Sequence, residues 1–420
     1  MPQTTLALQA RAFIYQAPKP RYSGFTWFKV IAARIIFPPV LLWDLIKLGA
    51  NKWLGRWVGG LILQAQECKH YVPAVTNETV SYYNEPQLSC AKYKVITHDR
   101  VLLDTLEIVH QSQANKAPEH QKYIIHLTGN ATCYEEIMHK MKEDAKALCT
   151  NVVGFNFRGV RSSTGRAKST DDLVIDGIAQ VQRLLDRGVS PKNIILKGHS
   201  LGGGVASLVA KHFHQLKQPI KIFNDRSFST ITNVVVGQIR GPERPGRIIL
   251  GWLANPFIKL ALALVKWEIN AGSAFRRIPE AYREYIVVRS RKALRSQYPD
   301  DRVIRHYASI HEALTSERSA RKKTIDKALK RTDDVISRTD PCQDRQALLD
   351  KRAALAQARK TMKDRKMETR DPYANGHCVS LDSLHSRSEK SANTFFREFV
   401  ERVPEEYSAC GYQRSAQASA

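Results

Sequence analysis

The 420 residues are enough for a large core, and a composition of 43% hydrophobic and 25% charged residues is typical of a globular rather than a disordered protein. Lys and Arg number 65 against 40 Asp and Glu, and the net charge of +25 suits an anionic partner, either nucleic acid or an acidic membrane surface. The seven cysteines have neither CxxC nor zinc-finger spacing. This argues against a disulfide framework or structural zinc and for a reducing compartment.

The start of the chain, MPQTTLALQARAF, has no basic segment followed by an apolar segment and a cleavage site, so no Sec-type signal peptide is expected. No charge-free apolar run reaches about 18 residues, so a standard membrane span is not expected either. These observations favour a cytoplasmic or peripheral-membrane location.

Residues 24–63 are apolar and rich in tryptophan, but they carry a charge every few positions. Pro38 and Pro39 separate two helical pieces. Amphipathic helices with tryptophan and basic residues often lie in a membrane interface. The same pattern also fits two helices packed on a domain, and both interpretations stay open. The tryptophans are Trp27, Trp43, Trp53 and Trp57.

From residue 92 onward, strand patterns alternate with helix patterns. This predicts an α/β fold with a mostly parallel sheet and helices on both faces. The first two strands are expected to form a hairpin around His98-Asp99-Arg100 within residues 92–111. Further strands are predicted at 122–127, 151–157, 193–197, 220–225 and 284–290, and helices at 134–148, 172–188 and 204–216.

One short motif points to chemistry. Residues 195–207 read ILKGHSLGGGVAS, in which Ser200 lies between Gly198 and Gly202. A strand, a Gly-x-Ser-x-Gly turn and a helix form a nucleophile elbow, which exposes the serine Oγ above the sheet. Such a serine needs a base that takes its proton and an acid that orients the base, and after an elbow of this kind the chain order is Ser, acid, His.

The surrounding sequence resembles a known family. Residues 151–207 resemble α/β-hydrolases of the ABHD type, which share an RG-x-x-x-S-x-G loop and a GHSLGG elbow, and NDRSFST at 224–230 resembles them as well. Together with the N-terminal LLWDLIKLGANKWLG, the core also resembles a narrower group: the lipase-like type IV secretion effectors of intracellular pathogens and the chlamydial CHLPS proteins. The resemblance implies an α/β-hydrolase fold, a serine triad and secretion into a host cell as an effector.

The resemblance also implies the acid and the oxyanion hole. The family places its acid first in a D-x-V-(V/I) pattern, which here is Asp301, with Asp300 as the alternative. Backbone N–H groups of Leu201 and Asn130 would bind the oxyanion. The family has HGN where this chain has Thr128 before a Gly-Asn pair, but the donor is a backbone group and is retained.

The expected base is His377, because a GH pair before an apolar run matches the family's catalytic histidine; His385 is the alternative. His306 and His311 follow the acid directly and are expected at the surface. The gap from Asp301 to His377 is longer than is usual in the family. A charged insertion accounts for it, since lengthening a surface loop costs little closure entropy.

The predicted organisation has four parts. Residues 1–66 are helical and apolar, and residues 67–312 form the hydrolase core with an apolar cap at 231–280. Residues 313–370 form an inserted, charged helical hairpin that turns at Thr339-Asp340-Pro341. Residues 371–420 complete the core and end in a polar tail.

We therefore expect a serine hydrolase that cleaves a carboxylic ester, with a lipid substrate in view of the two long apolar segments. A thioesterase or peptidase of the same fold and a non-catalytic, membrane-associated binding module stay open as alternatives. The expected partners are the lipid or ester substrate and an anionic membrane surface. Nucleic acid is not expected, because the aromatic residues are not interleaved with the basic run. No metal-ligand set or phosphate loop occurs in the sequence, so neither metal nor cofactor is expected.

Overall fold

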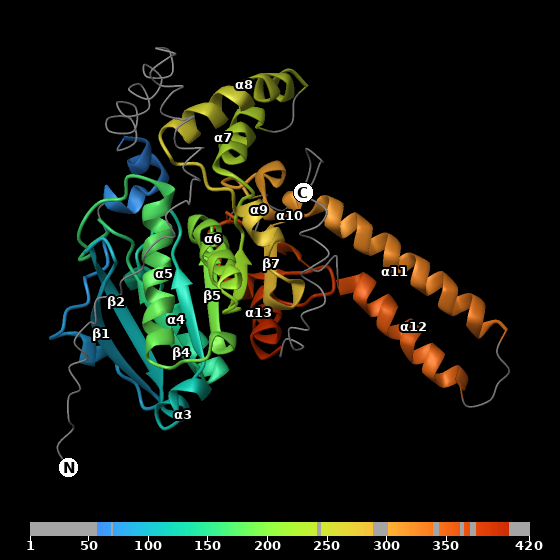
Figure 1. Cartoon of the computed structure of the whole chain (residues 1–420), viewed down its shortest axis with the longest axis horizontal. Coiled ribbons are helices and arrows are strands. Elements are labelled where there is room, and N and C mark those ends of the chain that lie inside the picture. Colours follow the sequence, from blue (N-terminus) through green and yellow to red (C-terminus); the bar gives the residue numbers. More distant parts are fainter. Residues whose placement is uncertain are drawn as a thin grey trace, which may run out of the picture.

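The computed structural model describes residues 57–68, 70–241, 245–288, 301–338, 344–361, 365–369 and 375–402. In this part of the chain one sheet has the strand order β1-β2-β4-β3-β5-β6-β7-β8-β9 (Figure 1). The strands are β1 (Leu88–Ile96), β2 (Leu102–His110), β3 (Tyr123–Leu127), β4 (Asn151–Phe155), β5 (Ile194–His199), β6 (Lys221–Asp225), β7 (Arg283–Val288), β8 (Lys366–Thr369) and β9 (Leu384–His385).

The strand directions confirm the predicted α/β-hydrolase fold. Strands β4, β3, β5, β6, β7 and β8 are parallel neighbours, whereas β1, β2 and β9 pair antiparallel with their neighbours. The predicted hairpin is β1 and β2, and Arg100 in its turn has a φ of 63°. In a parallel sheet the carboxyl ends of the strands meet along one edge, which is where such folds bind ligands.

Helices cover both faces of the sheet (Figure 1). The helices are α3 (Gln111–Ala114), α4 (Met138–Leu148), α5 (Thr170–Asp186), α6 (Leu201–Gln215), α7 (Ile231–Arg240), α8 (Pro245–Leu264), α9 (Ala271–Arg276), α10 (Ile310–Ala313), α11 (Thr315–Ile336), α12 (Asp344–Thr361) and α13 (Ala392–Glu401). Alternate residues of a strand point to opposite faces. Accordingly, Ile125 and Ile222 belong to the core under α5 and α6, whereas Ile124 and Phe223 belong to the core under α4 and α13.

The local sequence explains where the main helices begin and end. Helix α5 begins with a capping box, in which Ser169 and Asp172 satisfy each other's backbone N–H groups, and the chain turns away at Gly188 with a φ of 89°. Helix α4 ends at Cys149 in the left-handed conformation, with a φ of 47°. These signals fix the helices that flank the central strands.

A buried lysine attaches the last helix to the sheet. Lys221 of β6 donates hydrogen bonds to the carbonyl groups of Phe399, Val400 and Arg402, at 2.7, 2.8 and 2.8 Å. The last carbonyl groups of a helix have no partners within it, and a cation there is favourable. The rings of Phe223 and Phe396 pack edge to face beside it, at 4.8 Å. The C-terminal segment is thereby held against the centre of the sheet.

The apolar segment predicted as a cap forms α7, α8 and α9. Helices α7 and α8 stack on each other beyond the sheet (Figure 1), and Gln238 of α7 donates hydrogen bonds to the carbonyl groups of Arg302 and Val303. Among the described residues, α8 alone is long and apolar enough to cross a membrane, by length and composition only. It contains two basic residues and the helix-bending Pro256, and most of it is exposed.

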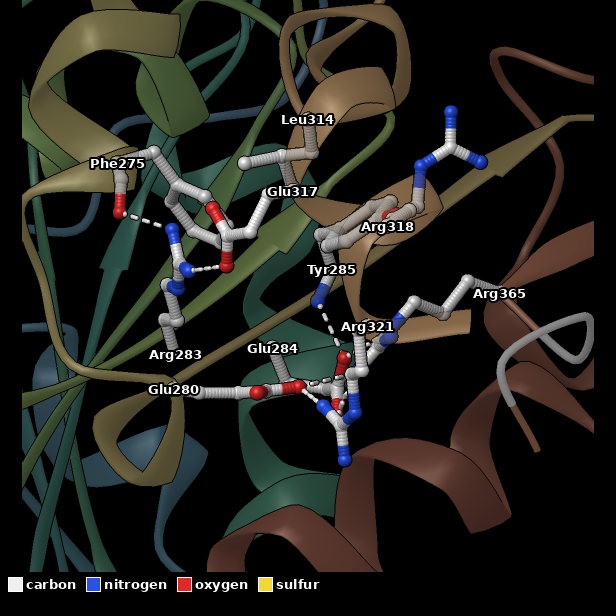
Figure 2. Close-up of a pocket in the computed structure, with 10 residues that line it drawn as sticks. All are labelled: Phe275, Glu280, Arg283, Glu284, Tyr285, Leu314, Glu317, Arg318, Arg321 and Arg365. Atoms are coloured by element: carbon white, nitrogen blue, oxygen red, sulfur yellow. Dashed lines mark hydrogen bonds and ion pairs between the residues drawn. The ribbon is translucent and has the colours of Figure 1, made fainter. Parts of the chain in front are cut away.

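The charged segment forms a helical hairpin, α11 and α12, that projects from the body (Figure 1). Its base is joined to the sheet by ion pairs around a small cavity (Figure 2). The structure corrects the predicted limit of the insertion at residue 370, because β8 pairs with β7 and buries Met367. The ion pairs at the base are Glu317 with Arg283, Arg321 with Glu280, and Arg365 with Glu284.

The outer part of the hairpin should therefore be dispensable for folding. Asp326 and Arg359 form an ion pair at 2.5 Å, so the two helices lie side by side there. Replacing residues 327–358 with a short Gly/Ser linker should shift the melting temperature by only a few degrees, because exposed ion pairs contribute about 0–1 kcal/mol each. As a control, extending the replacement to residue 369 removes β8 and should prevent folding. Unfolding of the shorter replacement would contradict the prediction.

Candidate active site

Ser200 lies in a strained turn between β5 and α6. Its backbone has φ 51° and ψ −116°, a conformation that costs on the order of 1–3 kcal/mol for a residue other than glycine. The Ser200 N–H donates a hydrogen bond to the carbonyl oxygen of Asp225, at 3.0 Å. The strand, turn and helix have the geometry of a nucleophile elbow.

The glycines of the motif are required by close backbone approaches. A Cβ at Gly198 would lie 2.5 Å from the carbonyl oxygen of Gly202. A Cβ at Gly202 would overlap the carbonyl oxygen of Leu127 at the end of β3. No side chain fits at either position, and this allows α6 to begin directly against the sheet.

The structure pairs the predicted acid with the predicted base. His377 Nδ1 lies 2.8 Å from Asp301 Oδ2, and both side chains are buried. The other oxygen, Asp301 Oδ1, accepts hydrogen bonds from the N–H groups of Val303 and Ile304, at 2.8 and 2.6 Å. These backbone donors fix the carboxylate, and the carboxylate in turn orients the imidazole. His377 Nε2 is then the ring nitrogen that is available to accept a proton.

Ser200 and His377 are not hydrogen-bonded to each other. Among the described residues, no hydrogen bond joins Ser200 Oγ to His377. The ring of His377 instead lies 4.9 Å, centroid to centroid, from the ring of His199, the residue before the serine. In hydrolases the contact between nucleophile and base often tightens only when substrate binds.

The loop after β3 lies beside Ser200. A Cβ at Gly129 would be 3.7 Å from the Cβ of Ser200, so the Thr128–Asn130 turn lies within reach of the elbow. Asn130 is tied down by the segment that precedes β1: its Oδ1 accepts from the N–H of Gln64 at 2.6 Å, and its carbonyl accepts from the N–H of Ala65 at 2.9 Å. The backbone N–H groups of Leu201 and Asn130 are both at this point of the sheet.

The start of the described chain packs on this loop. Residues 57–62 are helical, Leu63 is fully buried, and a Cβ at Gly59 would meet the ring of Trp267. On the opposite side, Trp57 and Leu61 are exposed. The rest of residues 24–63, including Trp27, Trp43 and Trp53, lies outside the described residues.

A second histidine–carboxylate pair, absent from the sequence analysis, lies next to the first. His199 Nδ1 is 3.0 Å from Asp225 Oδ2, and the Arg226 guanidinium binds both oxygens of Asp225. Burial lowers the pKa of His199 to about 4, against the opposing effect of Asp225. Burial alone would raise the pKa of Asp225, but the charges of Arg226 and His199 hold it well below its ordinary value. The segment NDRSFST contains both Asp225 and Arg226, and its resemblance to the family was the feature of the sequence that could have pointed to this pair.

The remaining sequence candidates are Asp300, His385, His311 and His306. Asp300 is outside the described residues. His385 lies on β9 opposite Glu368, away from Asp301. The expectation that His311 is a surface residue is wrong: the residue is 1% exposed, because it packs on β7 and its Nδ1 is hydrogen-bonded to Tyr285 Oη at 2.9 Å. His306 is half-buried.

Cavities and potential ligand groups complete the site. A cavity of about 240 Å³ adjoins the elbow and is lined by Gly129, His199 and Arg226, among others. Two side-chain groups in the described part of the chain have metal-like spacing. In each group some of the side chains already bind one another or the backbone. The groups are His70, Cys133 and Glu136, and His306, His311 and Glu312.

One protein family and several solved structures are similar to this chain. The model of the family described as Chlamydia CHLPS protein (DUF818) matches residues 25–343, a span that includes Ser200 and Asp301 and ends before His377. No curated protein matches the chain. An α/β-hydrolase from Vibrio vulnificus is 18% identical over 56% of this chain and 76% of its own, with a TM-score of 0.42. An acetyl xylan esterase from Paenibacillus is 13% identical over 56% of this chain and 78% of its own, with a TM-score of 0.36.

The buried His311 should make stability depend on pH. Burial, together with the charge of Arg318, lowers its folded-state pKa to about 2. Below pH 6.5 or so the unfolded chain binds a proton there that the folded chain does not. The free energy of unfolding should therefore fall with decreasing pH, by up to about 1.4 kcal/mol per pH unit for this one proton. Urea unfolding at pH 6.5, 5.5 and 4.5 should show a shallower dependence for His311→Asn than for the wild type. Equal slopes for the two proteins would contradict a neutral, buried imidazole.

Proposed function

The chain belongs to the Chlamydia CHLPS protein family, and from this premise and its α/β-hydrolase fold we propose that it is a serine hydrolase that cleaves the carboxylic ester of a lipid through an acyl-enzyme. The single observation that carries the proposal is the Asp301–His377 pair beside a strained elbow at Ser200. A buried carboxylate paired with an imidazole beside a strained serine turn is the arrangement that serine catalysis requires.

The proposed reaction uses these groups in the usual order. Ser200 Oγ attacks the ester carbonyl carbon while His377 Nε2 accepts the hydroxyl proton, and the Asp301 carboxylate stabilises the imidazolium. The oxyanion binds the N–H groups of Leu201 and Asn130, each worth on the order of 3 kcal/mol in the transition state. His377 then protonates the leaving alcohol, and a water deprotonated by His377 releases the carboxylic acid and restores Ser200.

The proposed lipid substrate and membrane partner are supported by α8. Its exposed face carries large apolar side chains, with Trp252 74% and Phe257 73% exposed. It contains Arg247 and Lys259 and no acidic residue. Aromatic side chains beside basic ones suit the interface of an anionic membrane. The other exposed apolar residues of α8 are Ile249, Leu250, Leu253 and Leu260.

The catalytic assignment is tested by labelling with a fluorophosphonate and by hydrolysis of p-nitrophenyl esters of increasing chain length. Ser200→Ala should abolish both labelling and hydrolysis. His377→Ala should lower kcat on the order of a thousandfold or more, as triad members generally do. Asp301→Asn should also lower kcat strongly, because the imidazole loses its orienting carboxylate.

His385→Ala is the matched control and should keep nearly full activity. Labelling that persists in Ser200→Ala, or loss of activity in His385→Ala but not in His377→Ala, would refute the assignment. Faster turnover of long-chain than of short-chain esters would support a lipid substrate, and preference for a thioester or an amide would point to the alternatives in the same fold.

Membrane binding is tested by flotation with liposomes. Full-length protein should bind liposomes that contain anionic lipid better than neutral ones, and binding should weaken as salt rises. Trp252→Ser with Phe257→Ser should weaken binding on the order of tenfold, because apolar area is lost from the interface. Tyr82→Ser, which removes another exposed aromatic far from α8, serves as the control. Unchanged flotation of the double variant would exclude α8 and leave residues 24–56 to be tested by replacing Trp27, Trp43 and Trp53.

A further inference from the structure

We propose that Arg226 is a positioning residue that fixes the loop of the catalytic base, an inference that rests on the proposed function. The residue follows β6 directly and is 4% exposed. Its backbone is in the left-handed region, with a φ of 49°, and its N–H donates to the carbonyl of Ile286 on β7, at 3.0 Å. The hydrogen bond to β7 thus fixes the backbone of Arg226, from which this side chain extends.

The guanidinium binds the base's loop on both sides of His377. One nitrogen, Arg226 Nη1, donates to the carbonyl oxygens of Gly376 and Val379, at 3.0 and 2.8 Å. Residues 375–380 form turns with no ladder partner in the sheet. In the described part of the chain, these two hydrogen bonds and the Asp301 contact are the side-chain bonds that tie this loop to the strand ends.

Asp225 holds the other edge of the guanidinium. Arg226 Nε and Nη2 donate to Asp225 Oδ1 and Oδ2, at 2.6 and 2.9 Å. A planar guanidinium held by two parallel bonds has a defined plane, which a lysine ammonium lacks. The nitrogen that reaches Gly376 and Val379 is therefore placed by the position of Asp225.

Asp225 also connects Arg226 to the turn at Ser200. Asp225 accepts from the backbone N–H of Ser200 through its carbonyl, and its Oδ2 lies 3.0 Å from His199 Nδ1. The His199 ring in turn lies against His377. Arg226, Asp225 and His199 thus connect the serine turn to His377 through contacts that do not involve Asp301.

A merely structural role predicts something different. If Arg226 only neutralised Asp225, any cation at this position would serve, and its loss would lower stability without a specific effect on turnover. If it positions His377, a cation that cannot bind two carbonyl groups should fold and yet catalyse slowly. Arg226→Lys separates the two roles, because it keeps the charge and loses the fork.

The experiment compares Arg226→Lys with Arg183→Lys in the full-length protein. Arg183 is also buried and paired, with Glu107 at 2.7 Å, but it lies on α5 away from the site. For Arg226→Lys we expect kcat to fall on the order of tenfold to a hundredfold with KM changed less than about threefold, as for a misplaced catalytic group. Arg183→Lys should change melting temperature alone. Guanidinium ion should restore part of the turnover of Arg226→Ala through the adjoining cavity of about 240 Å³.

A second readout does not depend on turnover. The proton of the His377 Nδ1–Asp301 hydrogen bond should give a downfield NMR signal that is sharp in the wild type and in Arg183→Lys and weakened in Arg226→Lys. Wild-type kcat in Arg226→Lys, or equal losses in both lysine variants, would overturn the proposal. If neither Arg226→Lys nor the double variant Asp225→Asn/Arg226→Gln folds, then Arg226 serves folding alone. This result would overturn the proposal as well. An inactive wild type that keeps the NMR effect would count against the proposed function and not against Arg226.

Discussion

The tight approach of backbone to backbone around Ser200 is the constraint on which the site depends. Gly198, Gly202 and Gly203 have no room for a Cβ, and at Gly203 it would lie 2.7 Å from the Cβ of Ser227. Strands β3, β5 and β6 and the first turn of α6 therefore meet at one point. The positions of the Gly129 loop and of the Asp225–Arg226 pair depend on this close packing. The geometry of the candidate site therefore depends on it as well.

Buried ion pairs fix the loops that the close packing leaves undetermined. Arg158, in the loop after β4, binds Asp176 of α5 at 2.7 Å and Asp99 of the β1–β2 turn at 2.6 Å. Burying such pairs adds little net stability, because desolvation of both charges opposes their attraction. Their effect is on geometry: a buried charge tolerates only the arrangement that pairs it. Arg226 and Arg158 act alike in this respect, and both lie in segments that resemble the family.

The sequence predicted local structure better than it predicted contacts between distant residues. The hairpin, the parallel strands and the elbow follow from periodicity and from glycine spacing, and these are local signals. The Asp301–His377 pairing was expected only through the family resemblance, because nothing in the spacing of 76 residues specifies it. The contacts of His199 and Arg226 were not predicted. The sequence beside a motif does not show whether a polar side chain faces solvent or a loop 150 residues away. His311 was misplaced for a related reason, because the tyrosine that it contacts, Tyr285, lies on strand β7 and not beside it in the sequence.

The order of these contacts along the chain has a consequence for biosynthesis. The Ser200 turn, the Gly129 loop and Asp301 all precede the helical hairpin, whereas His377 and the helix that Lys221 binds follow it. Contacts between residues so far apart form late, because a long loop has to close before they are made. During translation, when N-terminal segments fold first, strands β1 to β7 can begin to pair around the serine turn while residue 377 is still inside the ribosome. A nascent or C-terminally truncated chain would thus carry Ser200 without His377, and the proposed triad would be complete only after the segment that follows the hairpin has been synthesised.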